Sequence, residues 1–124
     1  MTDILFKDES YKIIGACMEV YKKLGAGFLE SVYSEALELE FKNAEIPYEK
    51  EKKLPVYYGE QKLNKYFRAD YVCYNAIILE LKATKFFIEA DSKQTLNNVK
   101  ATKFKLGLLV NFGTPSLTYK RIVN

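Results

Sequence analysis

One stretch constrains the fold of this chain more than any other: residues 68–82, which read R-A-D-Y-V-C-Y-N-A-I-I-L-E-L-K. Its apolar pattern is typical of two short strands joined by a tight turn. Asp70 lies in the first strand, whereas Glu80 and Lys82 lie two residues apart in the second and therefore point to the same face. Charged groups are unfavourable in such apolar strands unless they are paired. A divalent metal ion with its water and a phosphate is the partner that suits two carboxylates and an ammonium.

The length of the turn decides whether the two carboxylates meet. A three-residue loop, residues 74–76, sets Asp70 directly across from Glu80, whereas a two-residue loop places them on opposite faces of the hairpin. The alternative to a site is an ordinary ion pair between Glu80 and Lys82 on an exposed face, with Asp70 starting a turn. Spacing alone leaves both open, so the site hypothesis includes a prediction about register.

Composition limits the chemistry that is available. A chain of 124 residues predicts a single domain over residues 1–124. Histidine does not occur, which excludes histidine zinc sites and nucleophiles activated by histidine, so any chemistry must use carboxylates, lysine, tyrosine or serine. Cys17 and Cys73 lack metal-like spacing and lie in apolar surroundings, which predicts reduced core thiols. The net charge of +3 permits contact with nucleic acid but does not by itself argue for it.

No targeting or membrane segment is recognisable in the sequence. The N-terminal residues include acids and resemble no cleavable signal, and no apolar run approaches the length of a membrane span. These features predict a cytoplasmic protein without a membrane partner.

The remaining residues predict an α/β domain of the α+β type. Helical periodicity indicates three helices, the first with Ser10 as its N-cap and Gly residues after its end: 10–24, 29–44 and 89–104. Alternation or a continuous apolar run indicates strands beside the hairpin: 48–58, 62–67, 106–112 and 117–123. The first of these strands alternates Glu with Lys and lies among prolines, as an exposed edge strand does. The order predicts a largely antiparallel hairpin unit and a crossover helix.

Three segments resemble known families. The pattern R-A-D-x(9)-E-L-K over residues 68–82 resembles the metal-site motif of the PD-(D/E)XK nuclease superfamily. The sequence G-F-L-E-S-V-Y at residues 27–33 resembles the signature of the small bacterial GxxExxY protein family, and residues 96–113 also look like that family. The resemblance spans nearly the whole chain. It implies a restriction-endonuclease-like αβββαβ core with a mixed sheet flanked by helices, a divalent-metal site and a nuclease-like role.

The resemblance assigns roles within the hairpin. It makes Asp70 and Glu80 the metal ligands and Lys82 the catalytic lysine. Mg²⁺ or Mn²⁺ is the implied ion, because two carboxylates can hold such an ion and leave room for water and phosphate oxygens. Lys82 would orient the attacking water or neutralise the charge that develops on the phosphate. Ala69 stands where the superfamily motif has a proline, which leaves the metal chemistry unchanged.

The resemblance also implies two helix residues. Glu30 matches a glutamate that approaches the metal directly or through water, and its alternative role is that of an acid stabilising a helix N-terminus. Tyr33, one turn further on, is expected to share the face of Glu30 and favours the site role. Gln94 matches a glutamine beside the site, and its alternative is a solvated helix residue. Asn97 and Asn98 would extend this polar face toward a phosphate backbone.

Three function hypotheses follow. The first is a metal-dependent nuclease that hydrolyses phosphodiester bonds in DNA, or less favourably in RNA. The second is a non-catalytic nucleic-acid-binding module on the same fold, which needs a homodimer or a partner protein to grip a duplex. The third is a protein-binding module whose edge strand, near residues 50–53, pairs with a partner.

Overall fold

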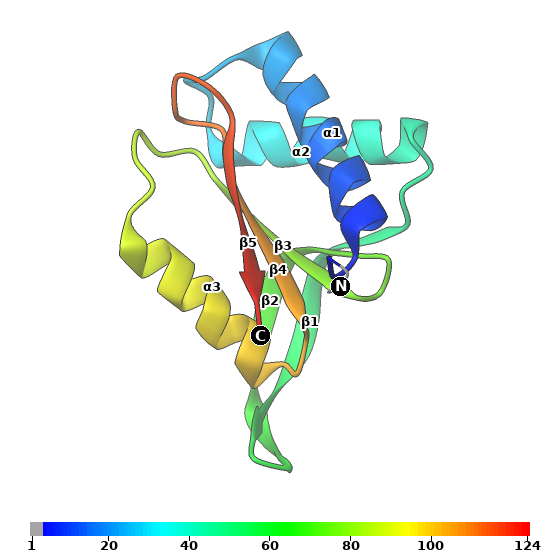
Figure 1. Cartoon of the computed structure of the whole chain (residues 1–124), viewed down its shortest axis with the longest axis vertical. Helices are drawn as coiled ribbons and strands as arrows, with labels where there is room; N and C mark the ends of the chain where they lie inside the picture. The colour runs from blue at the N-terminus through cyan, green and yellow to red at the C-terminus, as the bar shows by residue number, and fades with distance from the viewer. Residues whose placement is uncertain (1–3) are drawn as a thin grey trace.

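The computed structural model describes residues 4–124 as a five-stranded sheet with helices on both faces (Figure 1). The helices are α1 (Lys7–Leu24), α2 (Glu30–Asn43) and α3 (Glu89–Ala101). The strands are β1 (Tyr48–Tyr58), β2 (Gln61–Cys73), β3 (Ile77–Lys82), β4 (Leu106–Asn111) and β5 (Thr118–Val123). Helices α1 and α2 cover one face of the sheet and α3 lies on the other. None of the helices formed by residues 4–124 combines the length and apolar character needed to cross a membrane.

The strands are ordered as they follow in the chain, β1-β2-β3-β4-β5. Only β3 and β4 pair in parallel, and α3 provides the crossover that a parallel pair requires. The run from α2 to β4 confirms the predicted αβββαβ core in a mixed sheet, to which α1 and β5 are added. Strand β1 forms one edge of the sheet, as its charge pattern indicates.

Side-chain alternation in β3 separates two cores. Ile77, Leu79 and Leu81 pack with residues of α1 and α2, among them the buried, free Cys17. Ile78 packs on the opposite face, under α3. Because faces alternate along a strand, Glu80 and Lys82 follow Ile78 onto the α3 face. The apolar pattern of β3 therefore determines where its charged residues point.

The first helix begins earlier than predicted. It starts at Lys7, after Phe6 adopts a left-handed φ of 50°, so Ser10 is not an N-cap. The Ser10 hydroxyl lies inside the helix, where it donates to the Lys7 carbonyl at 3.1 Å and accepts from Arg121 Nη1 at 2.7 Å. Ser10 therefore links α1 to β5.

Two other boundaries differ by more than one residue. The strand predicted at residues 62–67 and the first strand of the hairpin are one continuous strand, β2. Helix α3 ends at Ala101 rather than at residue 104, because Lys103 takes a left-handed φ of 65°.

Candidate active site

The hairpin between β2 and β3 has the register that a shared site requires. Its connection comprises residues 74–76, and the first two of these have φ values of 56° and 54°. Tyr71 pairs with Leu79, so the register sets Asp70 across from Glu80, as predicted for a three-residue loop.

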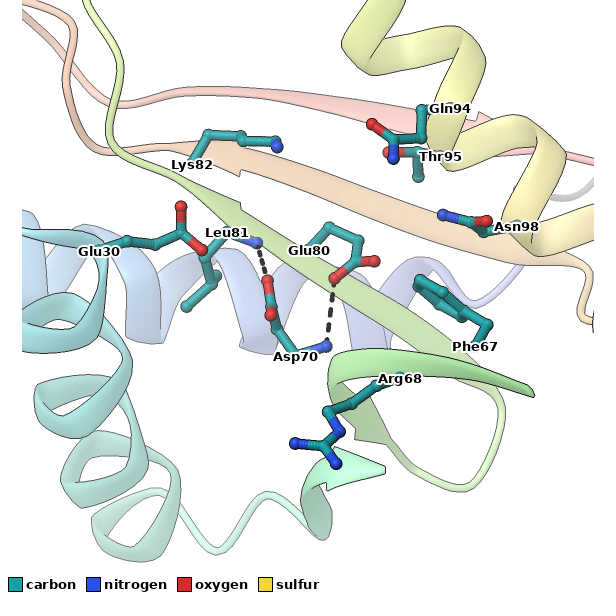
Figure 2. A pocket seen from close by; sticks show the side chains of 10 residues that line it. All are labelled: Glu30, Phe67, Arg68, Asp70, Glu80, Leu81, Lys82, Gln94, Thr95 and Asn98. Atoms are coloured by element: carbon teal, nitrogen blue, oxygen red, sulfur yellow. Dashed lines mark hydrogen bonds between the residues drawn. The ribbon is translucent and has the colours of Figure 1, made fainter. Parts of the chain in front are cut away.

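The two strands separate at the carboxylates. Backbone pairing ends at Tyr71 and Leu79. Beyond it, the amide of Asp70 donates to Glu80 Oε2 at 3.1 Å, and the amide of Leu81 donates to Asp70 Oδ2 at 2.8 Å (Figure 2). The carboxylates therefore take the place of backbone acceptors, and each is fixed by one of its oxygens. A pocket opens where the two strands separate.

The pocket has a volume of about 170 Å³, which is enough for a few water molecules and a phosphate group. Four elements line it: α2, β2, β3 and α3 (Figure 2). The lining residues are Glu30, Phe67, Arg68, Asp70, Glu80, Leu81, Lys82, Gln94, Thr95 and Asn98. The structure thus brings together all five residues that the resemblance assigned to a site.

The start of α2, where Glu30 lies, is held by Tyr33. The Tyr33 hydroxyl accepts from the Phe28 amide at 3.2 Å and donates to the Gly25 carbonyl. Its buried ring stacks on Phe112, with centroids 4.6 Å apart. Tyr33 therefore holds the loop from which α2 starts at Glu30. The expectation that Tyr33 shares the face of Glu30 is wrong, because its side chain enters the core.

The segment that follows Lys82 is hydrogen-bonded to the end of β4. The Lys82 carbonyl accepts from the Phe112 amide at 2.8 Å. Asn111 Oδ1 accepts from the amides of Thr84 at 3.1 Å and Gly113 at 2.9 Å, and its Nδ2 donates to the Thr84 carbonyl at 3.0 Å. The fully buried Asn111 was not recognised from the sequence, although an asparagine ending an apolar strand was the available signal.

The family model described as the PD-(D/E)XK nuclease superfamily matches residues 7–122. The chain belongs to this superfamily. The crystal structure of a protein designated SSO0001 has the same fold, with a TM-score of 0.59 and 17% sequence identity. That match covers 96% of this chain and 60% of the other, so this chain spans about three fifths of that protein's length. No curated protein shows significant sequence similarity to the chain.

Helix α3 presents polar groups to the pocket. Gln94 and Asn98 lie one turn apart on the face that lines it, whereas Asn97 is exposed elsewhere. Thr95 also lines the pocket and donates to the Asp91 carbonyl at 3.0 Å. Thr95 and Phe67 were not identified from the sequence, since neither residue type signals such a site.

The pocket contains an excess of negative charge. Burial, and next the charge of Asp70, raise the pKa of Glu80 to about 9. Burial and the same charge raise the pKa of Glu30, while Lys82 acts in the opposite direction on both. Among residues 4–124 no ion pair joins Glu80 to Lys82, and both are half-buried. The alternative of an exposed ion pair on a solvated face is therefore wrong.

The donor set fits a divalent cation of the kind that PD-(D/E)XK nucleases generally use. Over the described part of the chain, no three acidic, cysteine or histidine side chains form a group that could hold a metal ion. Mg²⁺ does not need such a group, because it binds through one or two carboxylates and fills its other positions with water and phosphate oxygens. Asp70 and Glu80 supply that pair, and a cation would neutralise the charge that raises the pKa of Glu80.

Without added metal, Glu80→Gln is expected to stabilise the protein at pH 8. The folded-state pKa of Glu80 lies above the ordinary value of 4.5, so the fold favours its protonated form. The wild-type protein therefore loses stability as the pH rises from about 4.5 toward about 9. Glutamine removes this loss, which grows by up to about 1.4 kcal/mol per pH unit above 4.5, so the variant should gain several kcal/mol at pH 8. Urea unfolding in EDTA at pH 5 and pH 8 measures it. Glu60→Gln, in an exposed turn, is the control, and equal pH dependence of the wild type and Glu80→Gln contradicts the prediction.

Proposed function

We propose that this chain is a divalent-metal-dependent nuclease that hydrolyses phosphodiester bonds in nucleic acid, with DNA favoured over RNA. One observation supports it most: Asp70, Glu80 and Lys82 converge on one pocket where β2 and β3 separate. A catalytic function requires this arrangement, and packing alone gives no reason to place two carboxylates there.

Each residue of the pocket has a role in the proposal. Asp70 and Glu80 would hold Mg²⁺ or Mn²⁺, with Glu30 approaching directly or through water. The bound ion supplies Lewis-acid stabilisation and a more acidic water. The Lys82 ammonium orients the attacking water or offsets charge on the phosphate. Gln94 offers an amide donor to a phosphate oxygen from the opposite wall of the pocket.

A cleavage assay tests the proposal directly. The purified chain is incubated with single-stranded and duplex DNA and RNA, in Mg²⁺, in Mn²⁺ and in EDTA. We expect cleavage with either metal and none in EDTA. Cleavage that EDTA leaves unchanged, or no cleavage of any substrate with either metal, contradicts the proposal.

Glu30→Gln is expected to lower the cleavage rate by about 10- to 100-fold, because it removes a charge beside the two ligands while keeping the side-chain shape. Glu35→Gln is the matched control, since Glu35 lies on the same helix and is exposed away from the pocket. Rates at several Mn²⁺ concentrations separate weaker metal affinity from slower chemistry. Equal rates for the two variants would remove Glu30 from the site.

The finer family assignment to the GxxExxY proteins is also a proposal. It is supported by a physical reason for each residue of the motif. Gly27 has a φ of 110°, which favours glycine; Glu30 begins α2 at the pocket rim; Tyr33 holds the loop between them.

A non-catalytic nucleic-acid-binding module is the alternative. The hydrogen bonds in the pocket favour it, because Asp70 and Glu80 each accept from a backbone amide without any metal. In this alternative a second copy of the chain or a partner protein supplies the rest of the surface that binds a duplex. Titration calorimetry with Mn²⁺ discriminates: weak metal binding together with intact nucleic-acid binding favours the module, and light scattering reports the oligomeric state.

A further inference from the structure

The hairpin of β1 and β2 extends well beyond the rest of the sheet. Residues 52–68, here called the arm, pair almost entirely with one another, whereas β2 pairs with β3 only from Tyr71 to Cys73. Figure 1 shows the arm projecting past the end of α3. Within the arm, only Leu54 and Phe67 at its base join a core among the described residues, so the exposed residues further out point to another use.

The arm contains more positive charge than the chain as a whole. It has one acid, Glu60, and five cations: Lys52, Lys53, Lys62, Lys65 and Arg68. Its net charge is therefore +4, against +3 for all 124 residues, so the remainder of the chain sums to −1. Among the ion pairs of the described residues, only Lys52 of these cations takes part. Such a concentration of unpaired cations is the electrostatic pattern of a polyanion-binding surface.

The arm is fixed relative to the pocket. Leu54 and Phe67, at its base, pack in the core under α3. Further out, the Lys103 ammonium lies 4.4 Å from the centroid of the Tyr57 ring. Arg68 belongs both to the arm and to the pocket lining, two residues before Asp70. A ligand strand that follows the arm therefore reaches the carboxylates.

One face of the arm combines cations with tyrosines. Lys53 is paired with Arg68, and the Lys53 ammonium lies 4.7 Å from the ring centroid of Tyr66, so these three share a face. That face points away from α3, since Phe67, the neighbour of Arg68, lies on the α3 side (Figure 2). The strand register shifts between Pro55 and Tyr57, and beyond this shift the Tyr57 ring faces Lys103 on the α3 side. Its neighbour Tyr58 therefore lies on the outer side. We call Lys53, Tyr58, Tyr66 and Arg68 the outer face.

The tyrosines of the outer face are open to solvent. Tyr58 is 77% exposed and Tyr66 is 56% exposed. Exposed aromatic rings between unpaired cations suit a single-stranded nucleic acid, because unpaired bases stack on the rings while the cations contact the phosphates. A blunt duplex offers its phosphates to such a face but no free base surface.

We propose that the outer face of the arm binds a single-stranded segment of nucleic acid, with phosphates on Lys53 and Arg68 and a base stacked on Tyr58. The inference rests on the proposed nuclease function in one respect: the path of the bound strand, which continues past Arg68 into the pocket. The substrate class is then nucleic acid with a single-stranded segment, rather than a fully paired duplex.

Charge-matched variants test the phosphate contacts. The double variant Lys53→Gln/Arg68→Gln changes the outer face, and Lys62→Gln/Lys65→Gln removes the same charge from the other face of the arm. Fluorescence anisotropy in EDTA measures the binding of labelled single-stranded DNA at several salt concentrations. We expect about tenfold weaker binding for the outer-face variant than for its control, with the salt slope reduced by about 1.4. Equal losses in the two variants overturn the inference.

A tyrosine variant tests stacking. Tyr58→Ala is expected to weaken single-strand binding about tenfold and to leave the binding of a blunt duplex unchanged. Tyr11→Ala is the control, since Tyr11 is 80% exposed on α1, outside the arm. An equal loss with single strand and duplex overturns the inference. Binding is measured without metal, so the two proposals can fail separately. If the outer-face variants bind single strands more weakly but the wild type cleaves nothing, only the nuclease proposal is refuted. If the wild type cleaves and the outer-face variants bind as well as their controls, only this inference is refuted.

Discussion

Replacing Asp70 by asparagine is expected to abolish metal-dependent cleavage and to leave the fold intact. Asparagine retains an oxygen that can accept from the Leu81 amide, the contact that Asp70 Oδ2 makes at 2.8 Å. It lacks the charge that binds a divalent cation. Because such a cation contributes several kcal/mol to stabilising the transition state, the rate should fall about a thousandfold or more. The cleavage rate and the Mn²⁺ affinity by calorimetry are the measurements.

The control for this substitution is Asp91→Asn. Asp91 lies in the first turn of α3, half-buried and outside the pocket lining, so its loss tests the effect of one charge on the same side of the sheet. Thermal unfolding confirms that both variants fold. If Asp70→Asn cleaves as fast as Asp91→Asn and binds Mn²⁺ equally, Asp70 is not a ligand and the role of the pocket has to be reassigned.

The sequence was sufficient to predict the two strands of the central hairpin, but not their register. Ile77, Leu79 and Leu81 are buried on one face and Ile78 on the other, a pattern that a two-residue and a three-residue turn both allow. The three-residue connection in the structure is what sets Asp70 across from Glu80. The positive φ of Tyr74 was not predictable, because tyrosine has no intrinsic preference for that conformation.

The arm shows where pattern-based prediction stops. Beyond the core, β2 has no buried face to alternate against, so its sequence lacks the period of a strand and was divided near residue 67. Continuous pairing with β1 is what joins the two halves. The length of the arm and its projection beyond the sheet depend on the pairing of β1 with β2, so neither strand's own sequence predicts them.

Contacts between distant residues were the least predictable. Asn111 meets Thr84 because β3 and β4 pair in parallel, which aligns their ends after a crossover of more than twenty residues. Nothing near either residue in the sequence indicates the other. Ser10 and Arg121 are hydrogen-bond partners that lie far apart in the sequence, so local sequence alone predicts Ser10 as a helix cap.

Gly113→Ala is expected to destabilise the protein by about 3 kcal/mol. A Cβ atom at Gly113 would lie well under 3.0 Å from the backbone nitrogen and oxygen of Thr84. Those atoms cannot rotate away as a side chain can, and Asn111 bonds both segments at this point. To relieve this clash the two loops must move apart, which breaks the hydrogen bonds of Asn111. The cost of these lost hydrogen bonds adds to the steric cost. Urea unfolding at constant pH measures the change.

Gly15→Ala provides the matched control because it makes the same chemical change in open space. No atom lies within 4 Å of a Cβ at Gly15, which is in helix α1, so alanine should stabilise the protein by about 0.5–1 kcal/mol. If the two substitutions change the free energy of unfolding in opposite directions, the close approach of the loops is responsible rather than the loss of a glycine.

Because the segment bonded by Asn111 follows directly after Lys82, the folded fraction of Gly113→Ala should also cleave more slowly at low temperature, whereas Gly15→Ala should not. Similar stability changes in both variants would mean that the loop at Thr84 yields easily and does not position Lys82.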